Sequence, residues 1–131
     1  MTLRWRDLDA FNHVNNSSFL TFLEEARLRW FARLPGDWNA PTFMPVVAAA
    51  NINYRAQLGW PGDIEVSLYC ERLGNSSITI AHRIVATEKP EVPYSDGNVV
   101  LVWINPGTGK PVALPTAVRQ ACAGTGLVAE G

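Results

Sequence analysis

The sequence predicts an α+β fold in which a curled antiparallel sheet wraps around one long helix. Residues 17–33 carry the apolar period of a helix, whereas the later segments carry strand patterns and are separated by turn residues. One helix cannot cover both faces of a five- or six-stranded sheet. A curled sheet would bury the broad apolar arc of the helix, and the remaining face and edges favour a dimer.

The helix predicted over residues 17–33 has one clear apolar face. Its members recur at the i, i+3, i+4 and i+7 spacing of a helical stripe: Phe19, Phe22, Leu23, Ala26 and Trp30. At about 100° per residue, three further residues extend this face on one side: Leu20, Arg27 and Phe31. This face is expected to lie against the sheet.

Two glutamates of this helix have different expected environments. Glu25 falls in the opposite sector with Arg29, which predicts a solvated i, i+4 ion pair worth a few tenths of a kcal/mol. Glu24 projects among apolar residues, so its carboxylate is expected to be partly buried and to use Arg27 as its partner.

Strand patterns lie on both sides of the helix. A short strand is predicted at residues 4–9, and further strands at residues 46–54, 63–72, 77–87 and 98–105. The last of these is apolar on both faces and should be central. Turn chemistry at Gly74-Asn75 and Asp96-Gly97 separates strands. The order is β-α-β-β-β-β, with a short last strand near residues 111–114 and a weak helix at residues 116–124.

Length and composition narrow the function classes. The 131 residues fit a single domain, 1–131, and the net charge of −1 argues against a nucleic-acid partner. Because no signal peptide or apolar run of about 20 residues occurs, we expect no membrane partner and a cytoplasmic protein. Cys70 and Cys122 lack metal-site spacing, so two reduced thiols and no metal are expected.

Two other sequence features have simple structural interpretations. Residues 106–111, PGTGKP, lack the Ser or Thr and the helix that follow the lysine of a phosphate-binding loop, so they predict a hairpin turn. His82 shares a strand face with isoleucines, which favours a hydrogen-bonded core or interface histidine over a ligand. There is also no GxSxG motif for a serine hydrolase.

The polar segment RDLDAFNHVNN, residues 6–16, comes immediately before the helix. Asn15 or Asn16 can cap the helix, whose unpaired N–H groups can polarise a carbonyl oxygen. A carboxylate just upstream could then activate water or attack that carbonyl, and Asp9 is the candidate. The alternative is that Asp9, Asn12 and Asn15 only cap and turn the chain.

Residues 4–31 resemble the first strand and helix of the hot-dog-fold acyl-CoA thioesterases of the 4-hydroxybenzoyl-CoA thioesterase group. The family signature runs D-x-D-x-x-G-H-V-N-N, an aromatic residue, then E-x-A-R. The matching positions here are Asp7, Asp9, His13 to Asn16, Phe19, Glu24, Ala26 and Arg27. The likeness continues through residues 52–66, 72–80 and 104–115. Phe11 stands where the related plant-type enzymes have an asparagine. Asn12 stands where the family usually has a glycine, immediately before the histidine.

The resemblance implies an acyl-CoA thioesterase of hot-dog fold. Asp9 takes the position of the family's catalytic carboxylate, as general base or nucleophile, and the Asn16 N–H that of the group polarising the thioester carbonyl. His13 and Asn15 would organise the loop. Glu24 would pack behind it as a supporting carboxylate or minor contributor.

The resemblance implies that coenzyme A is part of the substrate and not a separate cofactor. Members of the family bind coenzyme A between subunits. The chain is therefore expected to form a homodimer or a homotetramer. Five residues are candidates to contact it by position, although each arginine can equally be an ordinary solvated charge: Arg55, Arg72, Ser76, Ser77 and Arg83. Two alternatives stay open, a hot-dog enoyl-thioester hydratase or dehydratase and a non-catalytic acyl-thioester-binding module.

Overall fold

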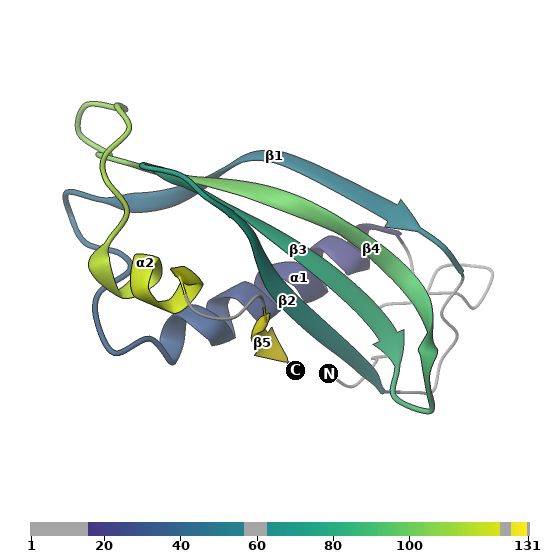
Figure 1. Cartoon of the computed structure of the whole chain (residues 1–131). Coiled ribbons are helices and arrows are strands. Elements are labelled where there is room, and N and C mark those ends of the chain that lie inside the picture. The colour runs from purple at the N-terminus through teal and green to yellow at the C-terminus, as the bar shows by residue number, and fades with distance from the viewer. Residues whose placement is uncertain (1–15, 57–62, 124–126, 131) are drawn as a thin grey trace.

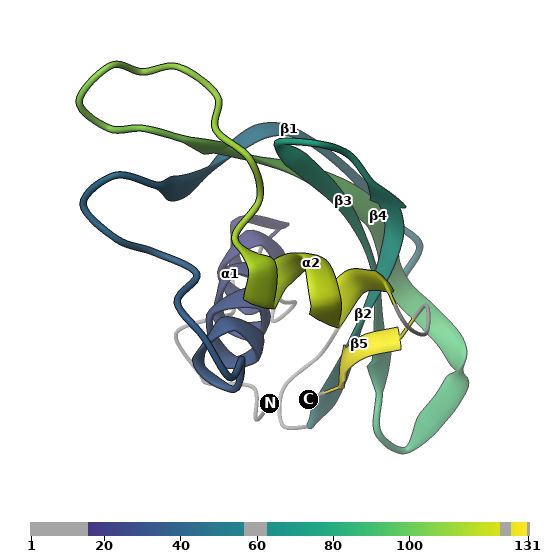
Figure 2. The same cartoon turned by 60° about the vertical axis from the view of Figure 1, so that its left-hand side comes forward.

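A five-stranded antiparallel sheet curls around one long helix in the computed structural model of the chain (Figures 1 and 2). The structure describes residues 16–56, 63–123 and 127–130. The elements follow the order α1, β1, β2, β3, β4, α2, β5, and the strands lie in the sheet as β1-β4-β3-β2-β5. The predicted hot-dog fold class is confirmed. The strand expected at residues 4–9 lies outside the described residues.

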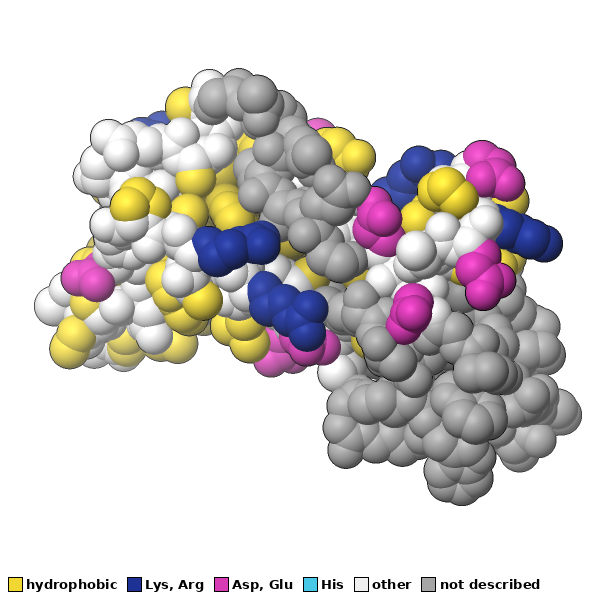
Figure 3. Space-filling model, turned by 90° about the horizontal axis from the view of Figure 1, so that it is seen from below, with side chains coloured by type: hydrophobic (Ala, Val, Ile, Leu, Met, Phe, Trp, Pro, Cys, Tyr) yellow, Lys and Arg dark blue, Asp and Glu magenta, His cyan; other side chains and the backbone are white. Residues whose placement is uncertain are grey.

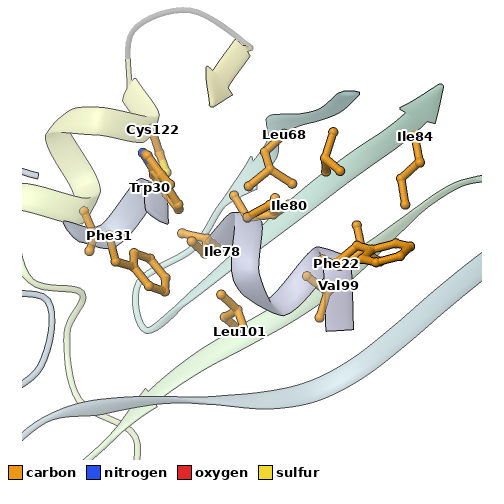
Figure 4. Close-up of a cluster of buried hydrophobic side chains, with 14 of the residues drawn as sticks. Phe22, Trp30, Phe31, Leu68, Ile78, Ile80, Ile84, Val99, Leu101 and Cys122 are labelled. Carbon is orange, nitrogen blue, oxygen red and sulfur yellow. The ribbon is translucent and has the colours of Figure 1, made fainter. Parts of the chain in front are cut away.

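Helix α1 (Asn16–Ala32) buries the predicted apolar stripe. Phe22, Leu23, Ala26, Trp30 and Phe31 are each at most 6% exposed. In Figure 4, Phe22 points toward Ile84 and Val99, and Trp30 lies beside Cys122. Leu20, which was predicted to extend this face, lines a cavity between the helix and the sheet and is 49% exposed.

Four long strands build the concave face of the sheet: β1 (Met44–Tyr54), β2 (Ile64–Leu73), β3 (Ser77–Ala86) and β4 (Lys89–Ile104). Alternate residues of β2 and β3 are buried, as the sequence predicted for β2. Strand β4 lies between β1 and β3, which confirms the expected central position of its apolar half. Trp103 of β4 is fully buried, and its Nε1 donates to the Trp38 carbonyl at 2.8 Å.

Strand β4 begins nine residues earlier than predicted. The expected turn at Asp96-Gly97 lies inside this strand, and the β3–β4 turn is formed by Thr87 and Glu88. Gly97 has a φ of +148°, and a Cβ there would lie 1.9 Å from the Asn51 carbonyl oxygen. The glycine therefore permits a close approach of β1, whereas the sequence suggested a reversal of the chain.

The C-terminal part covers the β2 side of the sheet. Helix α2 (Thr116–Ala123) was predicted, whereas β5 (Leu127–Glu130), which pairs with β2, was not. Residues 106–109 form the predicted turn, and the strand expected at residues 111–114 is reduced to an isolated bridge between Ile104 and Pro111. Neither described helix is long and apolar enough to span a bilayer.

Packing of α2 against β2 brings the two cysteines together. Cys70 and Cys122 are free thiols, as predicted. Burial, followed by a hydrogen bond with the Cys70 side chain, raises the pKa of Cys122 to about 12. The Cys122 thiol therefore stays protonated at neutral pH.

Candidate functional site

An inner cavity of about 150 Å³ lies between α1 and the concave face of the sheet. Its walls are mostly apolar and come from α1 and all four long strands: Leu20, Leu23, Ile52, Leu68, Ile80 and Val99. Leu20 is one helical turn, about 6 Å along the axis, from Asn16 at the start of α1. The cavity thus lies close to the first turn of α1, whose backbone N–H groups have no partner within the helix itself.

Within the polar segment before the helix, residues 6–16, only Asn16 belongs to the described residues. Helix α1 begins at this residue, as the family signature led us to expect. Asp9, His13 and Asn15 lie outside the described residues. Their proposed roles stay predictions.

His82 is one of four polar or charged residues that line the inner cavity, together with Glu24, Arg27 and Asn98. It is 5% exposed, and its Nε2 lies 3.1 Å from Oγ of the fully buried Ser95. Burial lowers the pKa of His82 to about 4, with Asp96 acting against this shift and Arg27 adding to it. The imidazole is therefore neutral at pH 7. The expectation of a hydrogen-bonded core histidine is confirmed.

The position of His82 in the cavity wall was not anticipated from the sequence. One polar residue among the apolar residues of a strand face was the available signal. Among the described residues no buried side-chain polar atom lacks a hydrogen-bond partner.

Glu24 and Arg27 lie on the side of α1 that faces β1. Glu24 is exposed, so the expectation of a partly buried carboxylate was wrong, because β1 leaves this flank of the helix uncovered. Arg27 is half-buried. Burial lowers the pKa of its guanidinium, and the charge of Glu24 acts in the opposite direction, which supports the predicted electrostatic pairing of these two residues.

A second, outer hollow of about 400 Å³ continues along α1 toward its C-terminal end. Its lining includes Leu28, Phe31 and Trp38, and the Phe31 and Trp38 rings stack with centroids 4.7 Å apart. The two hollows share three lining residues: Glu24, Arg27 and Val47. The two hollows therefore adjoin one another along α1.

The five candidate coenzyme A contacts form two groups. Arg55 and Arg83 lie near Asp96, at the end of the sheet where α1 begins. Arg55 pairs with Asp96 at 3.0 Å; hydrogen bonding to Asp96 raises the pKa of Arg55, and the bond from Arg55 lowers that of Asp96. The second group, Arg72, Ser76 and Ser77, lies at the opposite end, where Ser77 pairs with Val102.

The charges on the described surface are mixed. Acidic and basic side chains lie near one another on the face shown in Figure 3, among hydrophobic ones. The predicted ion pair between Glu25 and Arg29 is confirmed, with the two charged groups 2.6 Å apart. No three His, Cys, Asp or Glu residues come together as a metal site within the described part of the chain.

A sequence model of the thioesterase-like superfamily matches residues 3–122 of this chain. The chain belongs to the thioesterase-like superfamily. Its enzyme class is therefore thioester hydrolase, and the inner cavity with the adjacent helix start is the candidate active site of a thioesterase. The match includes the segment before α1, which contains Asp9 and His13.

Three relatives illustrate this thioesterase family. The long-chain acyl-CoA thioesterase FadM of Escherichia coli is 30% identical, over 90% of this chain and 90% of its own. The PA2801 protein of Pseudomonas aeruginosa, described as a candidate thioesterase, is 35% identical with a TM-score of 0.87, over 92% and 93% of the two chains. A Thermus thermophilus thioesterase solved with coenzyme A and zinc is also 35% identical, with a TM-score of 0.75, over 92% and 91%.

Proposed function

We propose that this thioesterase hydrolyses an acyl-CoA, with the acyl group in the inner cavity and the thioester carbonyl at the start of α1. The observation that carries this proposal is the apolar cavity that begins one helical turn from Asn16. The coenzyme A in the T. thermophilus structure and the acyl-CoA substrates in the name of FadM support the choice of carrier.

In the proposed mechanism, the Asn16 N–H donates to the carbonyl oxygen and stabilises the negative charge that develops there. Asp9 accepts a proton from water as the water oxygen bonds to the carbonyl carbon. The carbon–sulfur bond then breaks, and the coenzyme A sulfur leaves as a thiolate that takes up a proton. In the nucleophilic variant, the Asp9 carboxylate attacks first and water cleaves the resulting anhydride.

Other residues of the signature have supporting roles in this proposal. His13 and Asn15 organise the loop that carries Asp9. Glu24 is eight residues after Asn16, or about 12 Å along the helix axis, and is exposed where the two hollows adjoin. Its position there suits a minor role toward the acyl group.

Arg55 and Arg83 are the better candidates for the coenzyme A phosphates, because they lie at the end of the sheet where α1 begins. Arg72, Ser76 and Ser77 would instead contact coenzyme A bound to a second copy of the chain. The proposed compartment is the cytoplasm, where reducing conditions would keep Cys70 and Cys122 as thiols.

We propose a homodimer in which a second copy pairs along β1, or a homotetramer of two such dimers. Strand β1 forms one edge of the sheet, is eleven residues long and exposes Val47 and Tyr54. A long edge strand presents unpaired backbone groups that another strand can pair with. Light scattering after size-exclusion chromatography measures the assembly, and a monomer at micromolar concentration would contradict it.

The test of the catalytic proposal is thiol release from a panel of aliphatic and aromatic acyl-CoAs. We expect activity in the wild type and a loss of about 100-fold or more in Asp9→Asn, because the amide can neither accept a proton nor attack. Asp7→Asn is the matched control from the same segment and should retain most of the activity. Full activity in Asp9→Asn would reject its assignment, and hydration of crotonyl-CoA without thiol release would favour a hydratase.

A further inference from the structure

We propose that Cys70 and Cys122 form a redox site, in which a hydroperoxide converts the two thiols into one intramolecular disulfide. The disulfide would join β2 to α2 and so hold the C-terminal helix on the sheet. The whole chain contains two cysteines, so an oxidised Cys70 has no other internal thiol with which to react. This inference does not depend on the acyl-CoA proposal, because neither cysteine lines the inner cavity or the outer hollow.

Hydrogen bonds fix the position of α2 on the sheet. Nη2 of Arg119 donates to the carbonyl oxygens of Gly74 and Asn75, at 2.7 and 3.2 Å, in the turn between β2 and β3. Val118, the residue before Arg119, is fully buried in the hydrophobic core. Cys122 comes one helical turn after Arg119 and is 8% exposed. Packing of α2 on β2 therefore holds the Cys122 side chain against the sheet.

Cys70 lies on the concave face of β2, on the side where α2 packs. It follows Leu68 at the two-residue spacing of one strand face, and Leu68 belongs to the hydrophobic core. Cys70 is half-buried and packs against the same core, which includes Cys122. The Cys122 thiol forms a hydrogen bond with the Cys70 side chain, and Cys70 Sγ lies 3.8 Å from the Arg72 carbonyl oxygen. The two sulfur atoms are therefore already adjacent in the reduced protein.

The backbone around both cysteines can accommodate the closer approach that a disulfide requires. An S–S bond is about 2.05 Å long, so the sulfur atoms must move together. Strand β2 has an irregularity between Cys70 and Arg72, where its register with β3 shifts, and such a bulge interrupts the ladder of hydrogen bonds. Cys122 is the last residue but one of α2, where carbonyl groups have no partner within the helix. Both partners thus lie where their elements are least constrained.

The difference in exposure sets the order of the reaction. Cys70 is half-buried, whereas burial of Cys122 keeps its pKa at about 12, so the oxidant meets Cys70 first. The deprotonated Cys70 sulfur attacks one oxygen of hydrogen peroxide, and the O–O bond breaks. The other oxygen takes up a proton and leaves as water, so Cys70 becomes a sulfenic acid.

Cys122 completes the reaction. Its sulfur bonds to the Cys70 sulfur, the S–O bond of the sulfenic acid breaks, and the departing hydroxide takes the Cys122 proton to form a second water. In total, the two thiols lose two protons and two electrons, and one hydrogen peroxide is reduced to two water molecules. The buried thiol therefore needs no separate base, because the leaving group accepts its proton.

Intact-mass spectrometry after treatment with a few equivalents of hydrogen peroxide, followed by alkylation in denaturant, tests the proposal. We expect the wild type to lose the mass of two hydrogen atoms and to take up no alkyl group. Peptide mapping should find Cys70 linked to Cys122, and a thiol reductant should restore two alkylated cysteines. The melting temperature should rise by about 5 °C or more on oxidation, because the bond closes a long loop in the unfolded chain.

Two single-cysteine variants are the matched controls. In Cys122→Ser, Cys70 has no resolving thiol, so peroxide should add oxygen atoms and dimedone should trap the sulfenic acid. In Cys70→Ser, the buried Cys122 should stay unmodified over the same time. Neither variant should gain thermal stability from peroxide.

Three results would overturn the inference. The first is addition of oxygen to the wild type without loss of two hydrogen atoms. The second is a disulfide between two copies of the chain, seen as a dimer on a non-reducing gel. The third is an equal melting temperature of the reduced and the oxidised protein, which would reject the hold on α2. If Cys122→Ser does not fold, the wild-type masses and Cys70→Ser still decide the outcome.

Discussion

Neighbouring polar residues on the two faces of the sheet have opposite environments, buried on one face and near solvent on the other. On the concave face, His82 lies opposite Gly97 and binds Ser95, and both polar side chains are buried. On the convex face, one residue further along, Arg83 lies opposite Asp96, which pairs with Arg55 near solvent. Burial keeps His82 neutral, whereas Asp96 is stabilised as a carboxylate.

The difference shows how β alternation controls protonation. A shift of one residue changes a polar group from a low-dielectric cavity wall to a solvated surface. The concave face therefore holds a neutral ring in the cavity wall, whereas the convex face presents charges to the solvent. Three substitutions at these paired positions test this contrast.

The largest expected effect on stability is that of Gly97→Ala, because Gly97 pairs with both neighbouring strands, β1 and β3. The new Cβ would lie 1.9 Å from the Asn51 carbonyl oxygen and 3.1 Å from His82 Cε1, at a φ of +148°. Because β1 or His82 would have to move, we expect the free energy of unfolding to fall by about 3 kcal/mol or more. Urea denaturation followed by tryptophan fluorescence measures this change.

Gly109→Ala is the control for backbone strain alone. Gly109 has a φ of +71°, and a Cβ there would have no neighbour within 4 Å. Its expected cost is about 1 kcal/mol, that of a left-handed residue without a clash. Equal losses in the two variants would mean that close approach at Gly97 is unimportant.

A smaller, pH-dependent effect is expected from His82. Its pKa is about 4 in the folded protein, below the ordinary 6.5, so between these values the unfolded chain binds a proton that the folded chain does not. Stability should therefore fall as the pH is lowered from about 6.5 to about 4, by at most about 3 kcal/mol. His82→Gln should lose this part of the pH dependence in urea denaturation.

The difference between wild type and His82→Gln isolates this histidine, because the other titrating groups are present in both proteins. Parallel stability curves from pH 7 to pH 4 would show that His82 does not titrate differently in the folded and unfolded states. An NMR titration of the imidazole gives the folded-state pKa directly.

The smallest expected effect is that of Asp96→Asn on the convex face. Exposed ion pairs contribute little, so the unfolding midpoint at pH 7 should change little. Asp96 raises the pKa of His82, so its removal should move the NMR titration of that ring to still lower pH. A large loss of stability would instead indicate that the convex face is covered in the assembled protein.

Patterns that repeat over many residues were predicted well from the sequence. The apolar stripe of α1 and the alternation of β2 are set by local periodicity, and both are observed. A single dipeptide was less informative. Asp96-Gly97 has the composition of a hairpin turn, but the same glycine also allows strands to approach closely.

The environments of Leu20, Glu24 and His82 depended on how the sheet curves. Periodicity defines an apolar arc on a helix but not how closely the sheet covers it, so Glu24 was wrongly expected to be partly buried, and Leu20 is 49% exposed although it lines the inner cavity. The contact of His82 with the inner cavity joins α1 and β3, which local patterns do not relate. The role of Asp9 stays a prediction that rests on the family signature.

Within the described residues, β1 forms an edge of the sheet, and this edge has a consequence for how the protein folds. Its backbone groups can be satisfied by water in a single molecule or by another strand in an assembly. If the edge pairs with a second copy, association and folding are linked, and the unfolding midpoint rises with protein concentration. During synthesis, before that edge is paired, its unpaired backbone groups are open to aggregation.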